Sequence, residues 1–274
     1  MVEINSCEVC GNKMLNSVLN LGNHPLCDDL VPIGEERICN EYPIEILFCN
    51  DCYTAHQRFQ VPKEELFSGS YHYRARMTGS VLTGMSDLVE NCEKRFGSLM
   101  EKLVLDIGCN DGSLLNFFRE KQCITVGVEP TDAAKDSSHT TFQTYFNINS
   151  AKKILDKSGS PDFITFTNVF AHIGNLPELL DSLRLLITDK TIIVIENHYL
   201  GAVLQTDQFD TFDAAAEKVG GLNAVLGGTY LDTVSMVLET DPTKRILMMK
   251  DAFNAAGRSV ADLEYHEKKA LATQ

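Results

Sequence analysis

Four cysteines in the first part of the chain have the spacing of metal ligands. Cys7 and Cys10 form one Cys-x-x-Cys pair, and Cys49 and Cys52 form a second. Each pair bends the backbone so that two sulfurs face one point, and four thiolates complete the tetrahedral shell of a structural zinc ion. The alternative, two unrelated pairs of which one is redox-active, is disfavoured because neither pair stands between a strand and a helix. Four sulfurs leave no open position, so we assign this zinc to folding rather than catalysis.

The residues around these pairs support the same interpretation. The strand-like run EYPIEILF at residues 41–48 leads directly into the second pair, as a ribbon that presents two ligands would. Cys27 and Cys39 are then spare thiols, either buried as small apolar side chains or exposed at the surface. His24 and His56 could compete as ligands, but while four cysteines are present we interpret both as ordinary polar histidines.

A second group of polar residues surrounds a glycine turn. The run KLVLDIGCNDGSLLNFFREK predicts a buried strand, a turn with Gly108 and Gly112, and a helix from about Ser113. Glycines let a ligand approach the backbone, and the start of the helix offers free amide groups. The turn lacks the Gly-x-Gly-x-x-Gly pattern of dinucleotide folds, and Asp106 in front of it would repel a phosphate.

Asp106 is instead suited to accept hydrogen bonds from the ammonium group of an amino acid. Glu129 ends the next predicted strand, CITVGVEP, where an acid can bind both hydroxyls of a ribose. Either acid alone would equally suit a solvated strand end, but the pair in this order is more specific. Together they predict a pocket for S-adenosylmethionine, with Asp106 at the methionine part and Glu129 at the ribose.

Composition narrows the classes of partner. The 274 residues include 24 basic and 38 acidic side chains, for a net charge of −14. This charge opposes binding to nucleic acid and to anionic membrane surfaces, although one pocket can still hold an anionic metabolite. No apolar run reaches the roughly 20 residues of a membrane span, and the first residues do not resemble a signal peptide. We therefore expect a cytoplasmic protein whose nine cysteines serve metal binding or burial.

Further elements flank the glycine turn. Residues 61–80 read as a loop, and apolar spacing from Val81 to Cys92 predicts an amphipathic helix; such a segment commonly packs over the mouth of the next domain. PDFITFTNVFAHIGNLPELLDSLRLLI predicts a strand followed by a helix, with Asn168 and His172 near the crossover. TIIVIENHYLG predicts another buried strand. Ligands bind at the carboxyl ends of such parallel strands.

Residues 7–212 contain, in this order, the motifs CxxCG, LGNHPL, YPIEILFCNDC, VPKEELF, VLDIGCNDGSLL, GVEP, FTNVFAHI, ENHYLG and QFDTF. This series resembles the sugar C-methyltransferases of deoxysugar biosynthesis, of the tetronitrose type. The resemblance implies a small zinc domain, a Rossmann-like α/β domain that uses S-adenosylmethionine, and methylation of carbon 3 of a nucleotide-linked 4-keto sugar through an enolate. By position, the resemblance implies that zinc is bound by Cys7, Cys10, Cys49 and Cys52. It implies that the donor is contacted by Asp106, Gly108, Asn110 and Glu129. It also implies that Asn168 and His172 lie beside the adenosyl and methyl groups, and that His198 and Tyr199 face the sugar.

The chain departs from this family after its QFDT segment. Where the family continues with a Tyr-His-Glu-His stretch that supplies the proposed base, this chain has Asp213 followed by Ala214, Ala215 and Ala216. Three alanines cannot remove a proton, so His172, His198 and Tyr199 become the candidate bases. We recognise no match to the family's C-terminal domain, and residues 213–274 instead show helical periodicity and glycine stops.

These observations predict three regions: a zinc-binding domain at residues 1–75, a methyltransferase domain at 76–212 and a helical extension at 213–274. The first hypothesis is a C-methyltransferase acting on a nucleotide-linked keto-deoxysugar, with a possible homo-oligomer contact through the terminal helices. The alternative is a catalytically degenerate binding or assembly protein that has kept the fold. Methylation of a small molecule or nucleic acid on nitrogen or oxygen is the less favoured third hypothesis: the net charge opposes nucleic acid, and TNVFAHI stands where amino-methylating enzymes have an Asn-Pro-Pro-aromatic signature.

Overall fold

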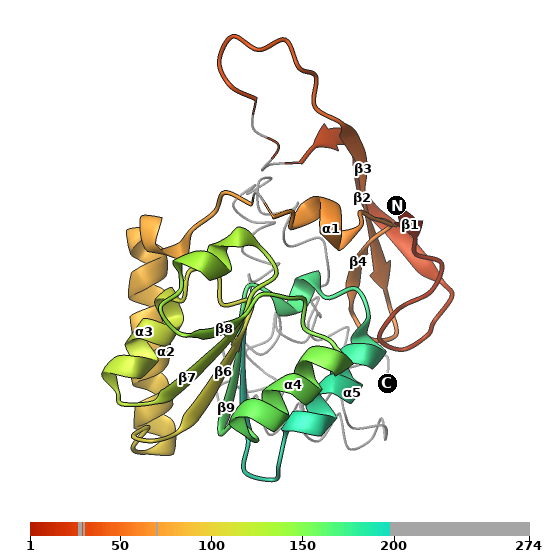
Figure 1. Ribbon diagram of the computed structural model, residues 1–274. Coiled ribbons are helices and arrows are strands. Elements are labelled where there is room, and N and C mark those ends of the chain that lie inside the picture. The colour runs from red at the N-terminus through yellow and green to blue at the C-terminus, as the bar shows by residue number, and fades with distance from the viewer. Residues whose placement is uncertain (27–28, 30, 70, 198–274) are drawn as a thin grey trace, which may run out of the picture. The chain divides into compact units, whose positions relative to one another are not determined.

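The computed structural model describes residues 1–26, 29, 31–69 and 71–197 (Figure 1). Two compact units are present, the first made of Met1–Glu3, Asn23–Pro43 and Phe59–Glu196. The described part of the second is Ile4–Gly22, Ile44–Arg58 and Asn197. His198, Tyr199 and the predicted helical extension lie outside the described residues, and the domain boundaries at residues 75 and 212 stay predictions.

A five-stranded sheet forms the centre of the first unit. Its strands are parallel and follow the order β10-β9-β6-β7-β8. All five residues of β6 are buried, which explains why four of them are apolar where a half-exposed strand would alternate; the fifth is Asp106. The strands are β6 (Leu103–Ile107), β7 (Ile124–Val128), β8 (Thr140–Phe142), β9 (Phe163–Thr167) and β10 (Ile192–Glu196).

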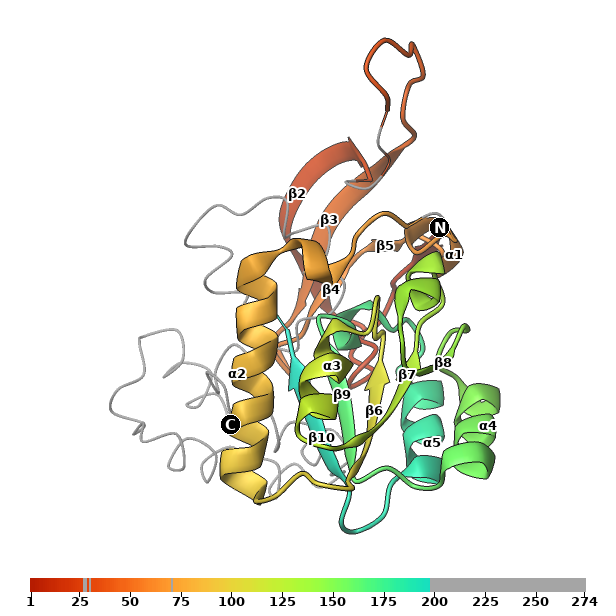
Figure 2. The same ribbon diagram turned by 60° about the vertical axis from the view of Figure 1, so that its left-hand side comes forward.

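Helices cover both faces of this sheet (Figures 1 and 2). The chain runs outward from β6 through β7 to β8, and then returns to β9 and β10 on the other side of β6. Because such crossovers are right-handed, α3 lies on one face with α2, and α4 and α5 lie on the other. The reversal between β6 and β9 is where open α/β sheets bind ligands. The helices are α2 (Gly79–Phe96), α3 (Ser113–Glu120), α4 (Ile148–Ser158) and α5 (Leu176–Leu186).

Every strand and helix predicted between residues 81 and 196 is confirmed, and the fold is the expected Rossmann-like α/β class. The segment 131–160, for which the sequence analysis made no assignment, contains β8, α4 and the 3-10 helix η2 (Asp132–Asp136). Helix α4 begins at a capping box, in which the side chain of Asn147 accepts a hydrogen bond from the amide of Ser150 and the side chain of Ser150 accepts one from the amide of Asn147. The remaining short elements are β1 (Val2–Glu3), β5 (Phe59–Gln60), α1 (Lys63–Leu66), η1 (Ala75–Met77) and η3 (Phe170–His172).

The described part of the second unit is built on a short sheet and a small apolar cluster. It contains parts of a three-stranded sheet in the order β2-β3-β4, formed by β2 (Leu15–Pro25), β3 (Glu41–Cys49) and β4 (Ala55–Gln57). The strand predicted ahead of Cys49 is thus confirmed. The buried core consists of Ile44, Ile46 and Ala55, with Leu19, Leu21 and Phe48 packed against it. A structural metal bound in this part of the chain is expected to contribute to its folding free energy.

Across the described ranges, no helix combines the length and the apolar character that crossing a bilayer would require.

Candidate functional site

The four predicted zinc ligands come together in the second unit. Their sulfurs all lie within 4.8 Å of one another, with Cys7 and Cys52 at 3.4 Å and Cys10 and Cys49 at 3.5 Å. A tetrahedral ion with Zn–S bonds of about 2.3 Å requires sulfurs about 3.8 Å apart. The cluster therefore fits a zinc ion without rearrangement of the backbone.

The two cysteine pairs fold in the same way. The carbonyl of Cys7 accepts a hydrogen bond from the amide of Gly11 at 2.8 Å, and the carbonyl of Cys49 accepts one from the amide of Tyr53 at 2.8 Å. In each pair the donating residue is left-handed, with φ of 78° at Gly11 and 58° at Tyr53. This repeated turn points both sulfurs of a pair toward the same ion.

Polar neighbours surround the sulfurs. His56 is completely buried, and its Nε2 lies 3.3 Å from Cys7 Sγ, while Asn12 Nδ2 donates to Cys49 Sγ at 3.8 Å. The hydrogen bond with Cys52 lowers the pKa of the Cys7 thiol to about 3. Because a thiolate can only accept, His56 donates an N–H to it and orients a ligand. His56 is therefore neither a surface histidine nor a fifth member of the cluster.

The second candidate site lies at the carboxyl ends of β6 and β7. Asp106, on β6, is 1% exposed, and its Oδ1 accepts a hydrogen bond from Thr165 Oγ1 at 2.7 Å. Burial raises the pKa of Asp106 to about 7, the hydrogen bond from Thr165 opposes this rise, and the charge of Glu129 adds to it. A buried carboxyl in this state is prepared to ionise when a positive ligand arrives.

Glu129 is fixed by three donors. Its Oε2 accepts from the amide of Asn110 at 3.0 Å, and its Oε1 accepts from the amide of Thr131 at 2.9 Å and from Thr131 Oγ1 at 2.7 Å. A carboxylate has about four acceptor positions, so about one remains for a ligand hydroxyl. The side chain is held in one orientation and keeps part of its binding capacity.

The turn between β6 and α3 comes close to its neighbours. Gly108 has a φ of 75°, and a Cβ atom there would lie 2.3 Å from Val169 Cγ2, so only glycine fits. Asn110 is left-handed, with a φ of 49°. Its Nδ2 donates to the carbonyl of Tyr73 at 3.1 Å, and its Oδ1 accepts from the amide of Ala75 at 3.0 Å. The side chain of Asn110, predicted to contact the donor, thus binds the preceding loop, while its backbone amide holds Glu129.

The segment 71–76, which we call the strap, was expected only to pack over the mouth of the domain. Its contacts with Asn110 confirm that it lies on the glycine turn. The sequence analysis assigned no role to any strap residue. The signal in the sequence that could have drawn attention to the strap is its two arginines, Arg74 and Arg76, within a polar loop.

Other predicted residues lie at the ends of β9 and β10. Asn168 follows β9 with a φ of 54°, is exposed, and donates its amide to the carbonyl of Glu196 at 2.7 Å. His172 ends η3, is half-buried, and packs edge-on against Phe67 with ring centres 5.3 Å apart. Burial raises the pKa of Glu196, the last residue of β10. This edge therefore brings a histidine and an acid near the candidate pocket.

Comparison with known families identifies two domains in the chain. A family model described as "Methyltransferase domain" matches residues 77–224, and one described as "Putative zinc binding domain" matches residues 7–67. C-methyltransferase NovU from Streptomyces niveus is 29% identical over 215 residues, which are 76% of this chain and 50% of NovU. The chain thus spans about half the length of this curated relative.

Solved structures of methyltransferases are also similar. The plantazolicin methyltransferase BpumL, in complex with a pentazolic desmethylPZN analogue and SAH, is 12% identical with a TM-score of 0.44, covering 73% of this chain and 81% of BpumL. A SAM-dependent methyltransferase from Archaeoglobus fulgidus is 25% identical with a TM-score of 0.34, and the match covers 41% of this chain and 52% of that methyltransferase. The family matches carry the assignment: the chain belongs to the methyltransferase-domain family and has a zinc-binding domain ahead of the methyltransferase domain.

Proposed function

We propose that this protein methylates a carbon atom of a nucleotide-linked keto-deoxysugar. The observation that carries methylation of carbon is the identity of 29% with C-methyltransferase NovU over 215 residues, and the sugar as acceptor rests on the series of motifs in residues 7–212. The buried acid next to the glycine turn supports it, since that acid suits an amino-acid donor better than a phosphate. When bound, S-adenosylmethionine supplies a methyl group on a positively charged sulfur.

Two acids of the pocket hold the donor. Asp106 accepts hydrogen bonds from the ammonium of the methionine part, and the arriving positive charge favours the ionised carboxylate. Glu129, oriented by Asn110 and Thr131, accepts from a ribose hydroxyl. The missing side chain at Gly108 makes room for Val169, so the glycine sets the path of the turn next to which the donor would bind. These contacts would hold the donor in one orientation, as transfer of its methyl group to a bound acceptor requires.

The acceptor must lose a proton before it can take a methyl group. A base removes the proton from the carbon next to the ketone, and the electron pair moves to the ketone oxygen to give an enolate. The enolate carbon then forms the bond to the methyl group, whose bond to sulfur breaks. His172 is the candidate base within the described residues, and His198 and Tyr199 are the candidates beyond them.

Proton removal can be tested separately from methyl transfer. The protein with S-adenosylhomocysteine and a nucleotide-linked 4-keto sugar in D2O should exchange the proton at carbon 3, as followed by NMR. Labelled S-adenosylmethionine should then place its methyl group on the same carbon. His172→Gln should slow the exchange about 100-fold if His172 is the base. His24→Gln, in an exposed part of β2, is the matched control and should leave the rate unchanged.

The alternative is a binding or assembly protein without catalysis. The specific observation in its favour is Ala214, Ala215 and Ala216, which stand where the resembled family has its proposed base. Binding of S-adenosylhomocysteine without proton exchange or methyl transfer, across a panel of keto-sugar nucleotides, would establish this alternative and refute the enzymatic proposal.

A further inference from the structure

Two separate segments hold the carboxylate of Glu129. On one side, Asn110 donates its amide to Oε2 and uses its side-chain Nδ2 to bind the carbonyl of Tyr73 in the strap. On the other side, Thr131 donates to Oε1 and also caps η2, by accepting from the amide of Ala133 at 3.2 Å. The orientation of Glu129 therefore depends on the positions of the strap and of η2 together.

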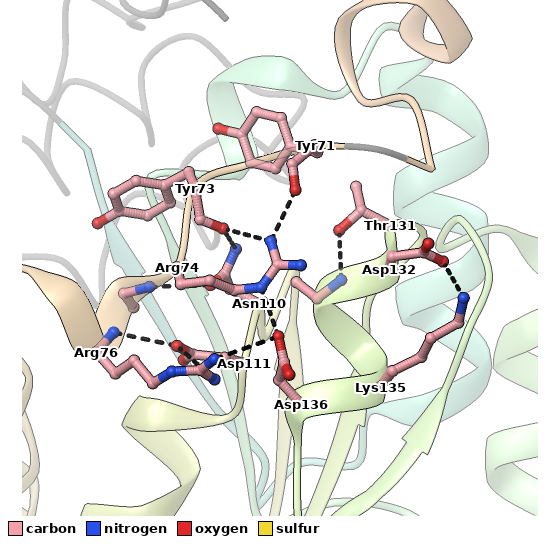
Figure 3. Close-up of polar contacts among 12 residues, drawn as sticks. Tyr71, Tyr73, Arg74, Arg76, Asn110, Asp111, Thr131, Asp132, Lys135 and Asp136 are labelled. Atoms are coloured by element: carbon pink, nitrogen blue, oxygen red, sulfur yellow. Dashed lines mark hydrogen bonds and ion pairs between the residues drawn. The ribbon is translucent and has the colours of Figure 1, made fainter.

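Arg74 joins these two segments (Figure 3). Its Nη1 donates to the carbonyls of Tyr71 and Tyr73 at 2.7 and 2.9 Å, and its Nε donates to Asp136 Oδ2, at the end of η2, at 2.6 Å. The side chain of Arg74 is only 15% exposed. A planar guanidinium can bind three acceptors in fixed directions, and such charge-assisted hydrogen bonds are among the strong ones in proteins.

We propose that Arg74 is a positioning residue that sets the orientation of Glu129 for the ribose of the methyl donor. The inference rests on the proposed donor role of Glu129. Hydrogen bonds and the short helix η2 form a closed ring of contacts that passes through this carboxylate. Removal of Arg74 breaks the ring between the strap and η2. The ring runs through Glu129, Asn110, Tyr73, Arg74, Asp136 and Thr131.

The second arginine of the strap does not have this role. The guanidinium of Arg76 lies 3.6 Å from Asp111 and 3.5 Å from Asp136, and its side chain is 47% exposed. Both distances are longer than those of a hydrogen bond, and the pair with Asp136 joins two exposed side chains, which contributes little. The amide of Arg76 does bind Asp111, at 3.1 Å, so the backbone of the strap is held there without the charge. Arg74 is thus the arginine that connects the strap to η2 through short hydrogen bonds.

The experiment compares S-adenosylhomocysteine with its 2′-deoxyribose analogue by calorimetry. The wild type should bind the ribose form about tenfold more tightly, as expected for one hydrogen bond to a charged acceptor. In Arg74→Met this preference should fall toward one, with most of the loss in affinity for the ribose form. Arg74→Lys keeps a charge near Asp136 but not the fork of donors, and should show a partial loss. Arg184→Met, which removes the 2.7 Å pair with exposed Asp181, is the control and should keep the preference.

The outcomes separate positioning from general stability. If Arg74→Met lowers the melting temperature and weakens both ligands equally, the residue is merely structural and the proposal is wrong. If Arg74→Met does not fold, Asp136→Asn can be used, because it removes the charge that Arg74 binds at the end of η2. An unchanged ribose preference in Asp136→Asn would also overturn the proposal. A wild type that binds S-adenosylhomocysteine without any ribose preference refutes the role of Glu129 alone. A wild type that binds neither ligand refutes the donor pocket as well.

Discussion

Replacing Asp106 by Asn should change stability and donor binding in opposite directions. The Asp106 carboxyl is 1% exposed, and burial is the main cause that raises its pKa from 3.8 to about 7. Each pKa unit corresponds to about 1.4 kcal/mol, so keeping this carboxylate ionised in the folded protein costs about 4 kcal/mol. The folded chain binds more protons than the unfolded chain between these two pKa values. Stability is therefore lost as the pH rises through this window.

The Asn variant should not show this loss. Between pH 5 and pH 8, the free energy of unfolding of Asp106→Asn should rise relative to the wild type by roughly 2 to 3 kcal/mol. With a urea dependence of about 3 kcal/mol per molar, the difference between the two midpoints should grow by about 1 M. Comparing two pH values removes any constant cost of burying the new amide. Asp181→Asn, at an exposed position, is the control and should show no such change.

Donor affinity provides the second measurement. If the ammonium of the donor binds the ionised form of Asp106, a pKa of about 7 means that the competent fraction rises about tenfold from pH 6 to pH 8. The dissociation constant of S-adenosylhomocysteine for the wild type should fall by the same factor, while Asp106→Asn should bind weakly at both pH values. A wild-type affinity that does not change with pH, together with a constant stability difference, would refute the reasoning.

Two further substitutions test the zinc cluster and the glycine turn. Cys49→Ser should release the metal and lower the melting temperature, whereas Cys39→Ser should keep the metal; elemental analysis of both proteins decides, and equal zinc contents would contradict the four-sulfur site. Gly108→Ala should destabilise the fold by about 2 kcal/mol more than Gly159→Ala, since both glycines are left-handed but only Gly108 faces Val169. Equal midpoints in urea would show that the close approach to Val169 has no effect.

The parts of the site that follow local spacing could be predicted from the sequence. Two Cys-x-x-Cys pairs require only turns within four residues, and the structure brings their sulfurs together. The buried strand, the turn and the start of α3 also lie within one short run, so Asp106 and Gly108 were found where expected. Parallel strands end at the same edge, which is why Glu129 could be assigned to the same pocket.

Contacts between distant segments could not be predicted in this way. Arg74 binds two main-chain carbonyls and an acid 62 residues further along, and no pattern in the sequence marks backbone oxygens as partners. Helix α4 went unassigned because the residues it buries include Ser150 and Ala151, which do not form a clear apolar stripe. The place of His56 beside a cysteine sulfur likewise depends on pairing between β3 and β4.

The order of strands has a consequence for the synthesis of the chain. Strand β6 lies at the centre of the sheet, but its neighbour β9 begins only at Phe163, long after β7 has paired on the other side. During translation one edge of a strand whose residues are all buried in the folded protein therefore stays without its partner until β9 has left the ribosome. Unpaired edges of this kind recruit strands from other chains. Chains released before Phe163 should consequently aggregate, and a chaperone that covers this edge should raise the yield of folded protein.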